Sequence, residues 1–333
     1  MNSNLNLKDL IRMTHVFRIS KALFVAHELG IFDRLANGEK GASELAHEIS
    51  ASEKVMAGFC NALSGIGLLV KKGDMYFLPD NLRAFLLKDS DRSFRNYIGM
   101  SHDVWNIWSD LERVIKEGKP VTTFMEIIYK DESKLRTYIH AMHERAREFS
   151  PLILEMVDTS NRKRMLDIGG GSGTYSFEWM KRYPQLRSTI LDLPEVLEIA
   201  KDYMKGYGLE DRVSFISGNY YELDIGQGEY DIVLMANVLH DGVEENKSLL
   251  RKAYNALEES GIAIIHGFAL DESECEPVGS ALIQLSMSPD ENVYKKSEYV
   301  KWLEEAGFKD IQCFEIDELT STAIPSSVIA TVK

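Results

Sequence analysis

The alternation of apolar strands with amphipathic helices after Arg164 constrains the fold more than any other feature. The expected strands span 164–169, 188–193, 213–217, 230–236, 262–268, 311–315 and 327–332. The expected helices lie between most of them, at 174–182, 194–206, 244–258 and 296–306. Such alternation is typical of a parallel sheet with helices on both faces, a doubly wound α/β fold. Because the last two strands leave no room for a helix between them, we expect an antiparallel pair at one sheet edge.

The preceding 160 residues predict a separate, mostly helical domain, which gives two domains at 1–160 and 161–333. Apolar residues between Ile11 and Ala26 recur at helical spacing, and Gly30 ends that helix. Two short helices at 43–49 and 51–65, followed by a hairpin at 68–78, make a winged-helix element. An element of this kind binds DNA in some proteins and serves packing or dimerisation in others.

Charge argues against nucleic acid and anionic membranes as partners. Acidic residues outnumber basic ones by 52 to 38 in the 333-residue chain, and basic and acidic residues are nearly balanced, 21 against 22, up to Ser160. Phosphate binding needs clustered Lys and Arg, which neither the winged helix nor the acidic second half provides. The polar N-terminus and the lack of a long apolar run predict a cytoplasmic protein. The three cysteines match no disulfide or metal spacing, so no metal is expected.

The strongest local motif is the segment Met165–Gly173, where an apolar strand runs into a glycine loop and a helix. A dinucleotide fingerprint fails in register, because residue 174 is Thr instead of Gly. The loop amides and the helix N-terminus suit a carboxylate, while Asp167 suits an ammonium group. Together they describe a site for the methionine moiety of S-adenosylmethionine (SAM). The motif residues expected to bind it are Asp167, Gly169, Gly170, Gly171 and Gly173.

Polar residues follow the next strands at the same edge of the sheet. Asp192 can accept both ribose hydroxyls of a nucleoside, or it can cap the helix that begins at Pro194. Asn219 and Tyr220 suit an adenine, by hydrogen bonding and by stacking. His240 follows the fourth strand and would lie beside the cofactor. Further cofactor contacts are expected from Leu193, Ala236 and Asn237.

These motifs together resemble those of the small-molecule O-methyltransferases of the caffeate and hydroxyindole type, which include bacterial members that modify phenazines and polyketides. The resemblance spans essentially the whole chain. It implies a class I methyltransferase-like sheet of seven strands and SAM as cofactor. It also implies an intertwined homodimer formed by the N-terminal domain. The histidine after the fourth strand would act as general base on a hydroxyl group, and here that residue is His240.

The sequence departs from this family at the catalytic surroundings. Gly242 stands where a Trp is common, and Asn219 where an Asp is common. The two glutamates that flank the histidine in plant members correspond to His266 and Val293. His266 is therefore a candidate second catalytic group, or simply a histidine at a strand end.

Acceptor binding is expected from the helical region. Tyr138, Met142 and Arg145 match a family segment that lines the acceptor pocket. Arg145 would bind an acidic acceptor, or it belongs to a solvated helix face. Met100 and Trp105 belong to rows of Met and aromatic residues that form either core or pocket.

The preferred function is therefore SAM-dependent methyl transfer to a hydroxyl oxygen of a small organic molecule. One alternative is an S- or N-methyltransferase, or a non-methylating SAM-dependent activity, because better nucleophiles need no strong base. A ligand-responsive DNA-binding regulator is a third alternative that the charge opposes. The identity of the acceptor is not encoded in any motif.

Overall fold

Two compact units make up the chain, Met1–Trp105 and Asn106–Lys333, in a computed structural model that describes residues 5–288, 290–316 and 327–333. The division falls earlier than the expected boundary at 160. The reason is the long helix α10 (Glu132–Met156), whose buried side chains pack against α11 (Thr174–Arg182) and α12 (Pro194–Tyr207) of the sheet unit. The hydrophobic contacts of α10 therefore place it in the unit that contains the main sheet, although its amphipathic pattern resembles that of the preceding helices.

The first unit contains the expected winged helix. Gly41 precedes α3 (Ala42–Glu48), and Ser52 precedes α4 (Glu53–Gly65). A small antiparallel sheet of order β1-β3-β2 completes it, with a turn at Gly73, which has a φ of 59°. The remaining elements are α1 (Leu7–Glu28), α2 (Ile31–Arg34), β1 (Lys40–Gly41), β2 (Val70–Lys72), β3 (Met75–Phe77), α5 (Asp80–Leu86) and α6 (Arg95–Asp103).

Helix α1 carries an unusual number of exposed apolar side chains. Asn6 caps its N-terminus by accepting hydrogen bonds from the backbone of Lys8 and Asp9. Beyond this cap the apolar residues lie all round the first four turns and are about half exposed or more. They are Leu7, Leu10, Ile11, Met13, Val16, Phe17 and Ile19. Apolar area of this size on one helix marks a surface that another molecule covers.

The second unit begins with short helices and then forms the main sheet. The helices are α7 (Trp105–Ser109), of which only the first residue is counted in the first unit, α8 (Leu111–Glu117) and α9 (Phe124–Ile128), followed by α10. No helix in the described parts of the chain combines the length and the apolar character needed to cross a membrane.

The main sheet has seven strands in the order β6-β5-β4-β7-β8-β10-β9. β4 to β8 are parallel, and β10 pairs antiparallel with both β8 and β9, which confirms the expected antiparallel pair. The residues that connect β9 to β10 lie outside the described ranges. The strand bounds are β4 (Arg164–Ile168), β5 (Arg187–Asp192), β6 (Val213–Ser217), β7 (Tyr230–Ala236), β8 (Leu257–Gly267), β9 (Lys309–Glu315) and β10 (Ser327–Val332).

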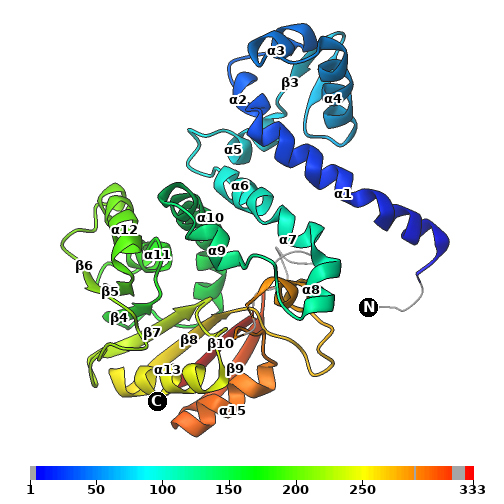
Figure 1. The fold of residues 1–333 in the computed structure, drawn as a ribbon. Helices are drawn as coiled ribbons and strands as arrows, with labels where there is room; N and C mark the ends of the chain where they lie inside the picture. Colours follow the sequence, from blue (N-terminus) through cyan, green and yellow to red (C-terminus); the bar gives the residue numbers. More distant parts are fainter. Residues whose placement is uncertain (1–4, 289, 317–326) are drawn as a thin grey trace. The chain divides into compact units, whose positions relative to one another are not determined.

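Helices cover both faces of this sheet (Figure 1). One core lies beneath α13 (Val243–Ala256) and α15 (Lys296–Ala306), and the other beneath α10, α11 and α12. Two shorter helical segments, α14 (Val278–Ile283) and the 3-10 helix η1 (Gln284–Ser286), precede α15. The doubly wound α/β prediction is therefore confirmed.

β8 begins five residues earlier than expected, at Leu257. The extension contains Ser260 in the left-handed region, at a φ of 64°, and the pairing register shifts between Tyr230 and Ile232. An irregular strand start of this kind has no alternating pattern, which is why the periodicity did not reveal it.

A buried carboxylate fixes the amino ends of the two central strands. Asp231 on β7 accepts hydrogen bonds from the backbone N–H groups of Lys163, at 2.9 Å, and Arg164, at 2.6 Å, where β4 begins. Its side chain therefore joins β4 to β7 before their ladder starts.

Replacing Asp231 by Ala should lower the free energy of unfolding by about 1–3 kcal/mol, because two part-buried backbone N–H groups lose a charged acceptor. Urea denaturation followed by circular dichroism measures this change. Asp202→Ala on the exposed surface of α12 is the matched control and should change stability little. Equal midpoints for the two variants would contradict the assignment.

Candidate active site

The largest concentration of predicted site residues lies around one cavity of about 340 Å³ at the carboxyl ends of β4, β5 and β7. Parallel strands deliver their following loops to the same edge, so residues far apart in sequence meet there. Ten of the eleven expected cofactor residues line it: Asp167, Gly169, Gly170, Gly171, Asp192, Leu193, Asn219, Tyr220, Ala236 and Asn237. A volume of this size accommodates an organic molecule of cofactor dimensions.

The eleventh, Gly173, serves the turn and does not line the cavity. Its φ is 76°, and a Cβ atom there would lie 2.5 Å from the Phe177 ring. Gly170 is similarly confined, because a Cβ would meet Ile190 at 2.7 Å. The loop therefore needs glycine at these positions so that it can turn from β4 directly onto α11.

Asp192 anchors the glycine loop and is not a helix cap. One carboxylate oxygen accepts the Gly171 N–H at 2.8 Å and the other accepts the Leu193 N–H at 2.7 Å. The following helix α12 has no side-chain cap. Burial raises the pKa of Asp192, and the two N–H donors oppose that rise.

Asp167 is a fully buried carboxylate with one satisfied oxygen. Oδ2 accepts a hydrogen bond from Ser176 at 2.7 Å, and Ser176 also contacts Ser188 at 2.8 Å. Among the described residues no group donates to Oδ1. Burial raises the pKa of Asp167 to about 7, with the nearby Asp192 adding to the rise. A cationic ligand group at Oδ1 would satisfy this oxygen and favour the ionised form.

The loop after β6 is held in place by Lys252, which sequence reasoning missed. Its Nζ donates to the carbonyl oxygens of Tyr220 at 3.0 Å, Tyr221 at 2.6 Å and Leu223 at 2.9 Å. Asn219 folds back within this loop, because its Oδ1 accepts the Tyr221 N–H at 2.9 Å. One cation on α13 therefore shapes the segment that presents Asn219 and Tyr220 to the cavity.

His240 lies in the cavity wall with two carboxylates beside its Nδ1. Glu291 Oε1 is 3.7 Å from this nitrogen and Asp241 Oδ1 is 3.9 Å away. Asp241 also accepts a hydrogen bond from the Tyr221 hydroxyl, while Glu291 Oε2 accepts the Ser288 N–H at 2.8 Å. Both separations exceed hydrogen-bonding distance, and Nδ1 has no hydrogen-bond partner among the described residues, so the two carboxylates lie near the ring without bonding to it.

Glu291 was not expected. The sequence indicated no carboxylate beside the histidine, because Val293 and His266 stand where plant members have glutamates. Val293 is buried at 4% exposure, and Glu291, two residues earlier, lies beside His240. The described residues 287–288 and 290–294 form no helix or strand, so no periodicity indicates which of their side chains point inward.

The same three side chains are a geometrically possible metal site. Within the described residues, ligand atoms of His240, Asp241 and Glu291 lie within 4.8 Å of one another. Acidic groups near one another are common in proteins without a bound metal ion.

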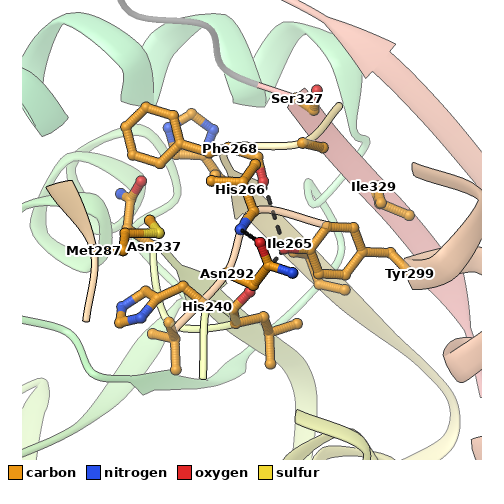
Figure 2. A pocket seen from close by; sticks show the side chains of 15 residues that line it. Asn237, His240, Ile265, His266, Phe268, Met287, Asn292, Tyr299, Ser327 and Ile329 are labelled. Atoms are coloured by element: carbon orange, nitrogen blue, oxygen red, sulfur yellow. Dashed lines mark hydrogen bonds between the residues drawn. The ribbon is translucent and has the colours of Figure 1, made fainter. Parts of the chain in front are cut away.

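His266 does not line the large cavity. Its ring is fully buried, with centroids 5.3 Å from Phe149 and 5.7 Å from Tyr175. Burial, and secondly Arg145, lower its pKa to about 3. It faces a small cavity of about 20 Å³ that shares Asn237 and His240 with the large one (Figure 2). The neutral, enclosed ring supports the strand-end interpretation over a catalytic one.

The acceptor side of the large cavity is built by α9 and α10. Tyr138, Met142 and Arg145 line it as expected, and Met125 and Tyr129 join them. Burial raises the pKa of Tyr138 to about 12, so its hydroxyl stays protonated. Arg145 is only 5% exposed, which excludes the solvated-face alternative.

Met100 and Trp105 belong to the first unit. There, the Trp105 ring packs edge-on against Phe24, with centroids 5.9 Å apart, and lies 5.1 Å from Lys21 Nζ. Their contact with an acceptor remains a prediction.

Helix α10 also contacts the glycine loop through a polar chain. His143 Nδ1 lies 2.7 Å from Thr174 Oγ1, which in turn lies 2.7 Å from Ser172 Oγ. The His143 ring stacks on Tyr203 at 4.0 Å, and burial lowers the pKa of this histidine to about 3. The neutral ring can therefore accept the Thr174 hydroxyl hydrogen.

Comparisons with known proteins agree with this arrangement. Residues 108–309 match the O-methyltransferase domain family, and residues 11–86 match the O-methyltransferase dimerisation domain. The chain is 24% identical over 300 residues to a 3-hydroxy-5-methyl-1-naphthoate 3-O-methyltransferase of Streptomyces sahachiroi, covering 88% of this chain and 87% of that protein. It is 26% identical over 318 residues to acetylserotonin O-methyltransferase of Macaca mulatta, covering 90% and 91%.

Two solved structures have the same fold as this chain. Human N-acetylserotonin methyltransferase in complex with SAM superposes with a TM-score of 0.85 at 25% identity, covering 100% of this chain and 99% of that one. An O-methyltransferase family protein from Burkholderia thailandensis gives a TM-score of 0.86 at 20% identity, covering 99% of both chains.

Proposed function

The chain belongs to the O-methyltransferase family, and we propose that it methylates a hydroxyl group of a small aromatic molecule bound between α10 and His240. SAM-dependent methyl transfer is the activity of this family. The observation that carries the proposal is the cavity itself, which joins the glycine loop, an imidazole with two carboxylates, and a wall of Met and Tyr side chains.

The residues around the cavity fit SAM. Asp167 Oδ1 is a buried, unsatisfied acceptor that would hold an ammonium group. Asp192 would accept ribose hydroxyls, and Asn219 and Tyr220 would contact the adenine. When bound, SAM supplies a methyl group on a positively charged sulfur that a nucleophilic oxygen can attack.

His240 would remove the acceptor hydroxyl proton at Nε2. Glu291 and Asp241 would then stabilise the imidazolium through Nδ1. The wall formed by Met142, Tyr138 and Tyr129 would hold a flat ring and exclude water. Since holding two reactants in near-attack geometry contributes about 7–11 kcal/mol, positioning would contribute more than proton removal.

The O-methyltransferase family favours oxygen over sulfur or nitrogen as the acceptor atom. The carboxylate partners of His240 support the same choice, because a hydroxyl needs base assistance where a thiol or amine does not. The relatives are named for a hydroxynaphthoate and for acetylserotonin, which are hydroxylated aromatic molecules.

We further propose that two copies of the chain associate through α1, because association would bury the apolar side chains that this helix exposes. The match to the dimerisation domain supports a homodimer. We also propose a cytoplasmic enzyme without a nucleic-acid partner, supported by the net charge of −14 and by the three unpaired cysteines.

Replacing His240 by Gln should lower kcat by roughly 10²–10⁴-fold while leaving affinity for S-adenosylhomocysteine unchanged, because the base is lost and the cofactor contacts stay. Glu291→Gln should give a smaller loss. Steady-state kinetics with a panel of phenols, together with calorimetric titration of S-adenosylhomocysteine, measures both effects. Glu244→Gln, on the exposed first turn of α13, is the matched control. Full activity of the His240 variant would exclude this residue as the base.

The affinity for S-adenosylhomocysteine should rise with pH between 5.5 and 7.5. Asp167 is neutral below its pKa of about 7 and must ionise to hold an ammonium group, so each pH unit below 7 should weaken binding by up to about tenfold. Isothermal titration across this range measures the dependence. Asp167→Asn should bind weakly with a flat profile, whereas Asp202→Asn should match the unmodified chain. A flat profile in the unmodified chain would show that Asp167 does not hold the cation.

Placing a charge in the exposed apolar face of α1 should separate the two copies. Phe17→Asp should weaken self-association by at least about tenfold, because a carboxylate would be buried at the interface. Size-exclusion chromatography with light scattering at several concentrations measures the mass. The control Ser133→Asp adds the same charge to the exposed first turn of α10, away from α1, and should leave self-association unchanged. A Phe17→Asp dimer as stable as the unmodified one would place the interface elsewhere.

A further inference from the structure

Arg145 is a buried cation in the wall of the large cavity. Arg145 is only 5% exposed. It is the only Arg or Lys among the described residues that line this cavity. Keeping a guanidinium inside a protein is costly in free energy unless it has a use or compensating contacts. No family motif identified in the sequence requires a cation at this position.

The guanidinium is held firmly in one orientation. Nη1 donates to Asn237 Oδ1 at 3.2 Å, and Cζ lies 5.2 Å from the Phe149 ring centroid and 5.4 Å from that of Phe268. These are not its only contacts, since Arg145 also has a further interaction besides those with Asn237 and the two rings. Five N–H donors in a planar fork can serve several partners at once, and a bound carboxylate can be one of them.

The position of Arg145 connects the acceptor wall with the catalytic segment. It lies one turn of α10 beyond Met142 and two beyond Tyr138, and all three line the cavity. Its partner Asn237 lies three residues before His240 in the segment that follows β7. A molecule that lies along the α10 wall with its hydroxyl near His240 would therefore bring a substituent within reach of Arg145.

Resting on the proposed function, we propose that the acceptor is a hydroxylated aromatic carboxylic acid whose carboxylate is bound by Arg145. The charge of the protein makes such a residue necessary for this substrate. A net charge of −14 repels anions, and the cavity also contains Asp167 and Asp192. A buried guanidinium offsets that repulsion locally and selects acids over neutral phenols of the same shape.

The test measures binding separately from methyl transfer. Hydroxybenzoic and hydroxynaphthoic acids, each paired with its neutral carboxamide, are titrated into the protein loaded with S-adenosylhomocysteine. At least one acid should bind more than tenfold more tightly than its carboxamide. Arg145→Gln should reduce the acid affinity by about 10–100-fold, should hardly change the carboxamide affinity, and should leave S-adenosylhomocysteine affinity within twofold. Arg145→Lys should recover part of the loss. Arg136→Gln, exposed on the same helix, should behave as the unmodified chain.

Three results would overturn the proposal. The first is that no acid in the panel binds more tightly than its carboxamide. The second is that Arg145→Gln weakens acid and carboxamide equally, which would indicate a packing role. The third is that it weakens S-adenosylhomocysteine instead, which would assign Arg145 to the cofactor carboxylate. If acids bind through Arg145 but no methylated product forms with SAM, the proposed function fails while the carboxylate site stands.

Discussion

The carboxylate of Asp192 is the interaction on which the rest of the site depends. It accepts the amides of Gly171 and Leu193, and so it joins the loop after β4 to the end of β5. The parallel pairing of β4, β5 and β7 brings the three strand ends to one edge, and there the Leu191 carbonyl accepts the N–H groups of Gly169 and Gly170. Once Asp192 fixes the glycine loop, Asp167 below it and the start of α11 behind it are fixed as well.

Much of the fold was predictable because strong periodicity reflects burial. The helices at 174–182 and 296–306 were predicted with their observed bounds, since each has a clear end, the first shortly before Pro184 and the second at Gly307. The strands β4 to β7 were found from their apolar runs. The start of β8 was missed because Ser260 interrupts the alternation, and the unit boundary was missed because α10 shows an ordinary amphipathic pattern that does not say what covers it.

The positions of site residues were predictable where a sequence motif restricts the backbone to one geometry. A strand, glycines and a helix in sequence can form only a few shapes, so the predicted loop residues lie together in the structure, and their contact with a cofactor stays a prediction. The positions of Glu291 and His266 could not be predicted in this way. Glu291 reaches His240 from an irregular segment about fifty residues away, and no local pattern shows its direction. β8 is buried on both faces at His266, so alternation cannot show which cavity its ring faces.

The contact between His143 and Thr174 has a consequence for how the two ligands meet. One face of α10 carries the acceptor wall, and another carries the histidine that contacts the first residue of α11. An acceptor that displaces this helix would move the glycine loop amides through Thr174 and Ser172. Through these contacts, a ligand in one half of the cavity would change the affinity for a ligand in the other half, and the change would be the same in both directions.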